Sequence, residues 1–139
     1  MRMSGTDATH SFVDSNVVLY LLSEDDTKAN LAESLLLRRP TISVQVLNEV
    51  ASVCSRKLRM PWIDVGQFLE PIRGLCRVVP ISVDTHDLGR KLAERHGLSF
   101  YDACIVASAS IEGCEYLYTE DMHDGLCVEG GPVLKNPFA

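Results

Sequence analysis

Four acidic residues lie where apolar stretches of this sequence end or are interrupted. They are Asp14, Glu49, Asp102 and Asp121. The first interrupts the run SFVDSNVVLY, and burial of an unpaired carboxylate costs several kcal/mol. Such an acid is either solvated where the chain changes direction or paired with a positive group. The elements that position the four acids decide between these alternatives.

Five short apolar runs predict β-strands, at residues 11–14, 41–44, 76–81, 115–119 and 131–135. The runs are continuous rather than strictly alternating, which is typical of strands buried on both faces of a parallel sheet. Helical periodicity separates them, over residues 27–38, 45–58, 62–75, 84–96 and 100–111. Strands that alternate with helices predict right-handed crossovers and an α/β sandwich.

The predicted helices begin and end at capping residues. Ser43, Asp84 and Ser99 are expected N-caps, because such side chains accept hydrogen bonds from the free N–H groups of a first helical turn. Gly97 follows the fourth helical stretch and is expected to be its C-terminal cap.

Length and composition predict one globular domain over residues 11–139 of the 139-residue chain. Residues 1–10 form a polar lead-in without the apolar region of a signal peptide. No apolar run approaches the roughly 18 residues of a membrane span, so no membrane partner is expected. The five cysteines form no CxxC pair and are expected to be core thiols in a reducing compartment, which predicts a cytoplasmic location.

The formal net charge is −6, which is unusual for a protein that binds nucleic acid. Basic residues nevertheless gather in four places, at residues 38–39, 56–59, 73–77 and 90–95. Most of them come late in predicted helices, where a cation offsets the helix dipole. Contact with phosphate groups is the alternative explanation for each of them.

Two of the four acids are expected at the carboxyl ends of strands. Asp14 ends the first predicted strand, and Asp121 lies just past the fourth. Ligands of open parallel α/β sheets bind outside these ends, so both acids are expected on one rim. Asp102 begins the helix that leads into the fourth strand, which places it near the same rim. The alternative is that Asp102 only caps its helix, because Ser99 and Asp102 have the spacing of a capping box.

Glu49 lies in the helical stretch VQVLNEVASVC, at the edge of the arc formed by Val46, Val50 and Val53. A solvated glutamate would more comfortably lie opposite that arc. Glu49 is therefore within reach of the rim, with an ordinary surface position as the alternative.

Four carboxylates that lie close together repel one another, and they persist only if a cation or protons bind to them. Oxygen ligands without clustered histidine or cysteine favour Mg²⁺ or Mn²⁺ over Zn²⁺. Such an ion activates a bound water and stabilises charge on a phosphoryl group. The four acids therefore predict a metal site suited to phosphoester chemistry.

Four segments, in order, resemble the signatures of PIN-domain ribonucleases: FVDSNVVLYLL, SVQVLNEV, LSFYDACIVASA and YLYTEDMHDG. The chain is most similar to the VapC-type toxins of toxin–antitoxin pairs, from about Ser11 to Phe138. The resemblance implies a three-layer α/β/α sandwich with a five-stranded parallel sheet. It also implies hydrolysis of RNA phosphodiester bonds with one or two Mg²⁺ or Mn²⁺ ions.

The resemblance assigns the metal to the four acids, with Glu49 holding it through water or holding a second ion. Asn16 and Thr119 match small polar positions that orient the acids by hydrogen bonds. Asp124 matches an auxiliary acid, or it is a turn residue before Gly125.

Two neighbouring loop residues are expected to stay outside the metal site. Glu120 is expected to be a solvated neighbour, and His123 an ordinary exposed loop histidine.

Three other functions compete with this interpretation. A receiver-like domain also binds Mg²⁺ at strand ends, but the expected acid pair is missing here and the third strand carries no acid to phosphorylate. A degenerate PIN-like domain would bind RNA or protein without cutting, although all four acids are present. A structure-specific DNA nuclease is disfavoured because the chain is short and lacks an inserted arch or clamp.

The resemblance also implies partners. An RNA substrate, a small antitoxin that covers the acids, and a second copy of the chain in a homodimer are expected. Residues 45–75, with Trp62, Phe68 and Leu69, are candidate surfaces for the protein contacts. Packing of these side chains in the core is the alternative.

Overall fold

A computed structural model gives the structure of residues 10–139, so the predicted lead-in lies outside the described residues except for its last member. Five strands form one sheet: β1 (Ser11–Val13), β2 (Thr41–Ser43), β3 (Arg77–Val79), β4 (Tyr116–Tyr118) and β5 (Val133–Lys135). The helices are α1 (Ser15–Leu19), the 3-10 helix η2 (Tyr20–Leu22), α2 (Asp26–Leu36), α3 (Val44–Arg56), α4 (Trp62–Leu75), α5 (Val83–His96) and α6 (Phe100–Ile111).

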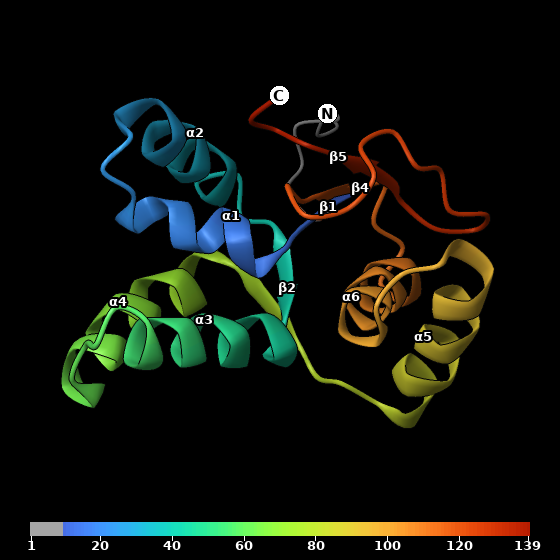
Figure 1. Ribbon diagram of the computed structural model, residues 1–139, viewed down its shortest axis with the longest axis horizontal. Helices are drawn as coiled ribbons and strands as arrows, with labels where there is room; N and C mark the ends of the chain where they lie inside the picture. Colours follow the sequence, from blue (N-terminus) through green and yellow to red (C-terminus); the bar gives the residue numbers. More distant parts are fainter. Residues whose placement is uncertain (1–9) are drawn as a thin grey trace, which may run out of the picture.

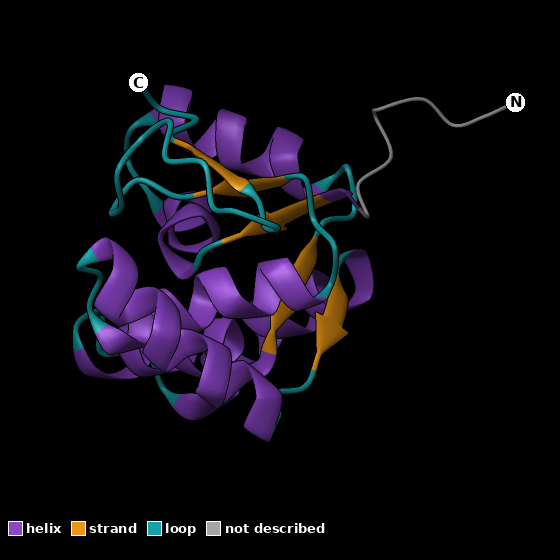
Figure 2. Cartoon of the chain, turned by 90° about the vertical axis from the view of Figure 1, so that its right-hand side faces the viewer, coloured by secondary structure: helices purple, strands orange, loops and turns teal. Residues whose placement is uncertain are grey.

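The strand order is β3-β2-β1-β4-β5, and all neighbouring strands are parallel. The chain moves from β1 to β2 to β3 across the sheet and then crosses back to β4. Right-handed crossovers therefore place α1 to α4 on one face of the sheet and α5 and α6 on the other. Figure 1 shows this division, and Figure 2 shows the strands passing between helices. The predicted three-layer α/β/α sandwich is confirmed.

Burial on both faces explains why the strands are continuously apolar. Phe12, Val13, Ile42, Leu117 and Leu134 are all fully buried, and they come from four of the five strands. Because each face of the sheet is covered by helices, consecutive residues need apolar side chains. All five strands were predicted at their observed places, and each is shorter than its predicted range.

The predicted caps are confirmed at three helix ends. The Ser43 hydroxyl accepts a hydrogen bond from the Val46 N–H at 3.4 Å. The Ser99 hydroxyl accepts one from the Asp102 N–H, also at 3.4 Å. Gly97 ends α5 in the left-handed region with φ of 67°, which glycine adopts without steric cost.

The predicted N-cap at Asp84 is wrong. Ser82 caps α5 instead, and its hydroxyl accepts from the Thr85 N–H at 3.2 Å. The Thr85 hydroxyl in turn accepts from the Ser82 N–H at 3.2 Å, which completes a capping box. Asp84 lies in the first turn, where its charge complements the helix dipole.

None of the five cysteines forms a disulfide bond within residues 10–139. Four are buried, as predicted, whereas Cys127 is exposed. Burial raises the pKa of Cys76 and of Cys114 to about 11, so these thiols stay protonated and unreactive near neutral pH. No helix of residues 10–139 combines the length and the apolar character needed to cross a bilayer.

Gly89 allows α5 and α6 to pack closely. A Cβ atom at Gly89 would lie 2.8 Å from the Cys104 sulfur and 3.4 Å from the Cys104 Cα. Gly89→Ala is therefore expected to lower the free energy of unfolding by about 1–3 kcal/mol. The matched control is Gly66→Ala in α4, where a Cβ atom would meet nothing within 4 Å and should raise stability slightly. Urea unfolding measures both, and equal stabilities would contradict the close packing.

Candidate active site at the carboxyl ends of the strands

Strands β1 and β4 bring two of the predicted acids together. The strands pair in parallel with Val13 opposite Tyr118, so the residues that follow them leave the sheet side by side. Asp14 follows β1 directly, and its N–H donates to the Tyr118 carbonyl at 3.0 Å. Asp121 lies in the loop after β4.

Asp14 is also the N-cap of α1, which answers why an acid interrupts the apolar run. Its Oδ1 accepts a hydrogen bond from the Ser15 N–H at 2.7 Å. The side chain is only 3% exposed. The chain therefore changes direction at Asp14 while the carboxylate stays under the rim of the sheet.

Asn16 and Thr119 connect the two acids. The Thr119 hydroxyl donates to Asp14 Oδ2 at 2.9 Å. The Asn16 amide donates to Asp14 Oδ2 at 3.3 Å and to Asp121 Oδ2 at 3.0 Å. The side-chain oxygen of Asn16, Oδ1, accepts a hydrogen bond from the Glu120 N–H at 3.2 Å, which holds the Asn16 side chain against the loop after β4. Asn16 thus contacts both carboxylates, whereas Thr119 contacts the Asp14 carboxylate and accepts from the Asp121 N–H at 3.2 Å.

Glu49 reaches the site from α3. Its Oε1 accepts a hydrogen bond from the Ser15 hydroxyl at 2.9 Å, and the same hydroxyl lies 3.4 Å from Asp14 Oδ1. Its Oε2 accepts from the Gln45 amide at 3.0 Å. Gln45 also donates to the Tyr101 carbonyl at 2.9 Å, so it joins α3 to the start of α6.

Asp102 lies in the first turn of α6, as predicted from the Ser99 cap. Burial raises its pKa, with further contributions from the charges of Asp121 and Glu49, against a hydrogen bond from Ser99 that lowers it. Gln45, which contacts Glu49, also contacts the Tyr101 carbonyl one residue before Asp102, and the charges of Asp121 and Glu49 are near enough to raise the pKa of Asp102. We call Asp14, Glu49, Asp102 and Asp121 the acid rim.

Asp14 shows the largest effect of this environment. Its pKa is raised to about 6: burial raises it most, hydrogen bonds from Thr119 and Ser15 lower it, and repulsion from Glu49 and Asp102 also raises it. A buried carboxylate among other carboxylates is costly to ionise. A bound cation would remove that cost.

Ion pairs within residues 10–139 join Lys28 to Glu120, Arg77 to Glu112 and Arg95 to Glu129. None of these pairs includes a residue of the acid rim. The candidate metal ligands of the acid rim are all carboxylate oxygens, which are hard ligands that fit Mg²⁺ or Mn²⁺. In the described residues, no group of three His, Cys, Asp or Glu side chains is already arranged to hold an ion. The chemistry of the carboxylates fits such an ion, and their side chains would have to move closer together to hold it.

The two remaining acids of the β4 loop are held elsewhere. Glu120 is not simply solvated as predicted, because it accepts from the Tyr20 hydroxyl and pairs with Lys28 at 3.4 Å. Asp124 Oδ1 accepts from the Asn136 N–H at 2.8 Å, a structural contact that matches the alternative expectation of a turn residue. Neither contact leads to the acid rim.

Sequence reasoning missed Ser15 and Gln45, which hold Glu49 in place. Both could have been found: Gln45 is one helical turn before Glu49, and Ser15 follows Asp14 at the start of a helix. A groove of about 640 Å³ opens beside Glu49. A second hollow of about 400 Å³ is lined by Asn16 and Asp121.

Comparison with known proteins identifies the architecture. The family model for the PIN domain matches residues 11–123. No curated protein sequence matches the chain significantly. A toxin–antitoxin complex from Klebsiella pneumoniae contains a chain with 23% identity and a TM-score of 0.68, over 91% of this chain and 97% of that one.

Two further solved structures share this fold. VapC20 of Mycobacterium tuberculosis, described as a toxin that cleaves the sarcin–ricin loop, has 24% identity and a TM-score of 0.64, over 80% of this chain and 89% of that one. FitAcB from Neisseria gonorrhoeae has 18% identity and a TM-score of 0.66, over 92% and 98% of the two chains. At these identities the likeness shows the fold.

Proposed function

The chain belongs to the PIN-domain family, and from this premise we propose that it is a metal-dependent ribonuclease and the toxin of a toxin–antitoxin pair. The proposal is supported by four carboxylates from separate elements that Asn16, Ser15 and Gln45 link to one another, and within residues 10–139 no basic side chain forms an ion pair with them. The description of VapC20 as a toxin that cleaves the sarcin–ricin loop supports an RNA phosphodiester as the substrate.

The acid rim would hold Mg²⁺ or Mn²⁺. When bound, the ion supplies an activated water and stabilises charge on the phosphoryl group. Asn16 holds the carboxylates of Asp14 and Asp121 at fixed positions, because one amide donates to both. Ser15 and Gln45 hold the two oxygens of Glu49. These neutral donors orient the acids without neutralising them, which leaves their charge available for a cation.

Two acids of the same loop provide a matched test. Asp121→Asn removes a member of the acid rim and is expected to lower metal-dependent RNA cleavage more than about 100-fold, beyond the usual loss for a residue that only supports a metal ligand. Asp124→Asn keeps the contact with the Asn136 N–H and should cleave like wild type. If both variants cleave like wild type, the acid rim is not the active site.

The alternative function is a degenerate PIN-like module that binds RNA or protein without cutting. The absence of a preformed three-residue metal site in the described part of the chain favours it. Metal titration and RNA cleavage together separate the two functions, since a degenerate module would leave RNA uncut at every Mn²⁺ concentration.

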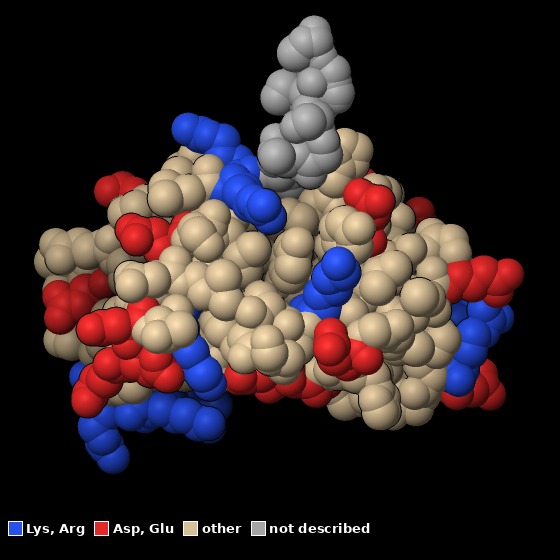
Figure 3. Space-filling model, turned by 90° about the horizontal axis from the view of Figure 1, so that it is seen from above, with Lys and Arg blue, Asp and Glu red and all other residues tan. Residues whose placement is uncertain are grey.

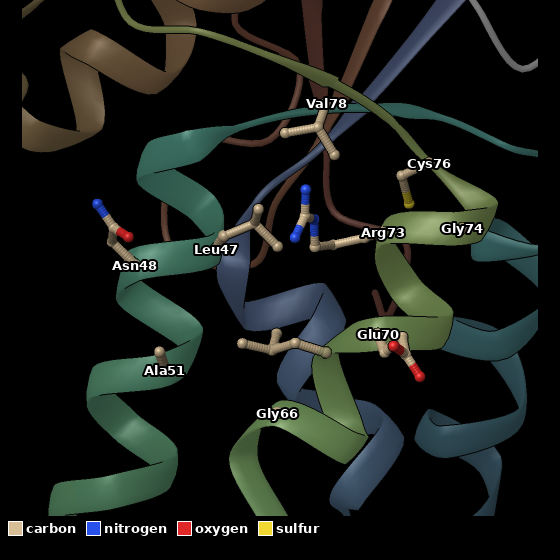
Figure 4. Close-up of a pocket in the computed structure, with 10 residues that line it drawn as sticks. Leu47, Asn48, Ala51, Gly66, Glu70, Arg73, Gly74, Cys76 and Val78 are labelled. Atoms are coloured by element: carbon tan, nitrogen blue, oxygen red, sulfur yellow. The ribbon is translucent and has the colours of Figure 1, made fainter. Parts of the chain in front are cut away.

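The proposed protein partner is a small antitoxin, supported by the toxin–antitoxin complex among the similar structures. It would cover the acid rim, with an arginine among the carboxylates, and would inhibit cleavage. A groove of about 650 Å³ between α3 and α4 is a second candidate contact, where Arg73 extends towards Leu47 (Figure 4). The free thiols support a reducing, cytoplasmic location.

A homodimer is proposed through α4. Trp62 and Ile63 at its start are 69% and 70% exposed, whereas Phe68 and Leu69 pack partly against the core. Two large neighbouring apolar side chains on a surface are typical of a contact site. Light scattering should give a mass near twice 15.4 kDa, reduced to one chain by Trp62→Asp. A monomeric wild type at high concentration would contradict the dimer.

A further inference from the structure

The groove beside the acid rim is lined by side chains that have no role in the proposed reaction. Its volume is about 640 Å³, and α3, α5 and the start of α6 line it. Its side chains include Gln45, Asn48, Arg56, His86, Phe100 and Tyr101. Glu49 lines the same groove, so the groove opens directly onto the acid rim.

Aromatic rings form one wall. Tyr101 is 67% exposed and Phe100 is 37% exposed. Their ring centroids are 5.6 Å apart, and the His86 ring meets Phe100 edge-on at 5.5 Å. Exposed rings of this kind are the surfaces on which unpaired nucleobases stack.

Polar groups complete the groove. Gln45 donates to the Tyr101 carbonyl and to Glu49, which fixes the aromatic wall relative to the acid rim. The amide of Asn48 offers both a donor and an acceptor for a base edge. Arg56 makes no ion pair within residues 10–139 and lies two helical turns after Glu49, about 10 Å along α3.

The net charge of −6 favours RNA contacts to bases over contacts to phosphates. On the face shown in Figure 3, acidic side chains lie close to the basic ones. With a net charge of −6, the protein gains little from non-specific attraction of phosphate. Contact with bases is the remaining source of affinity, and only unpaired bases expose their faces.

We propose that this groove is a nucleotide subsite of the proposed ribonuclease. The base of an unpaired nucleotide next to the scissile phosphate stacks on Tyr101, supported by Phe100, with its edge towards Asn48. A neighbouring phosphate of the same strand contacts Arg56. The inference rests on the proposed function, and it assigns contacts with one nucleotide to Tyr101, Phe100 and Asn48 and with its neighbouring phosphate to Arg56.

Binding of a short fluorescent single-stranded RNA tests the subsite, measured by anisotropy in Mg²⁺ with Asp14→Asn as the background that prevents turnover. Tyr101→Ala is expected to raise the Kd at least about fivefold, the lower bound for loss of one stacked base. Tyr101→Phe keeps the ring and should bind like the parent. Leu37→Ala is the control, because Leu37 is 61% exposed and does not line the groove.

Arg56→Gln should reduce the slope of log affinity against log salt by about 1, the signature of one lost phosphate contact. If Tyr101→Ala and Leu37→Ala bind RNA equally, the subsite is wrong, even if the wild-type protein cleaves RNA. If Tyr101→Ala weakens RNA binding but wild type never cleaves, the subsite stands and the proposed reaction fails. Unchanged RNA affinity with weakened binding of an antitoxin would assign the groove to protein instead.

Discussion

Asp14→Asn is expected to abolish RNA cleavage and to stabilise the protein at the same time. Asp14 is 3% exposed, and the balance of burial, hydrogen bonds and neighbouring acids raises its pKa from 3.8 to about 6. Holding it ionised at pH 7 therefore costs about 3 kcal/mol, from roughly two pKa units. Asparagine removes the charge and can still accept from the Ser15 N–H. Function and stability thus oppose each other at this residue.

The stability gained by Asp14→Asn depends on pH, because folding raises the pKa of Asp14. Because the folded pKa lies above the unfolded value, the folded state binds more protons between about pH 4 and pH 6. The contribution of Asp14 to stability therefore falls as the pH rises through that window. The stability difference between Asp14→Asn and wild type should be largest at pH 7 and should shrink towards pH 4.

Urea unfolding in EDTA at several pH values measures this difference. Asp25→Asn is the control, because Asp25 is an exposed N-cap of α2 that asparagine replaces equally well. The control should match wild type in both stability and cleavage. An Asp14→Asn variant less stable than wild type at pH 7 would show that its hydrogen bonds outweigh the cost of its burial.

The second large effect expected is stabilisation by divalent metal. A cation that binds only the folded acid rim should raise stability by about 2.7 kcal/mol at 100 times its Kd. For a chain of this length that corresponds to a rise in Tm of roughly 10 °C. Thermal unfolding with and without Mn²⁺ measures it, and EDTA should reverse the rise.

Asp102→Asn should lose most of this stabilisation, because it removes a carboxylate whose pKa is raised by neighbouring acids. Asp124→Asn should keep it, because that side chain contacts the Asn136 N–H and not the acid rim. An equal rise in Tm with Mn²⁺ in wild type, Asp102→Asn and Asp124→Asn would place the metal elsewhere on the surface.

The parallel sheet made part of the site predictable. Asp14 and Asp121 follow strands, and parallel strands end at one rim, so local sequence was sufficient to bring them together. Glu49 and Asp102 lie on helices, where a helical wheel left a surface position or a simple cap equally open. The order of the elements and the repulsion argument grouped these two with the others, and the resemblance in the sequence supported that grouping.

Contacts between distant side chains could not be read from the sequence. The ion pair of Glu120 with Lys28 joins residues 92 positions apart, and no local pattern predicts it. Ser82, and not the predicted Asp84, is the N-cap of α5, because Ser82 and Thr85 form a capping box with each other. The short helices α1 and η2 contain too few residues for a periodic pattern.

Cleavage of a mixed pool of structured RNA, followed against Mn²⁺ concentration, tests the central claim most directly. Wild type and Asp102→Asn are compared, with their folding checked by circular dichroism. The acid rim as a nuclease site predicts cutting by wild type that rises with metal, stops in EDTA and is lost in Asp102→Asn. Cutting that persists in EDTA, or that is equal in the two proteins, would contradict it.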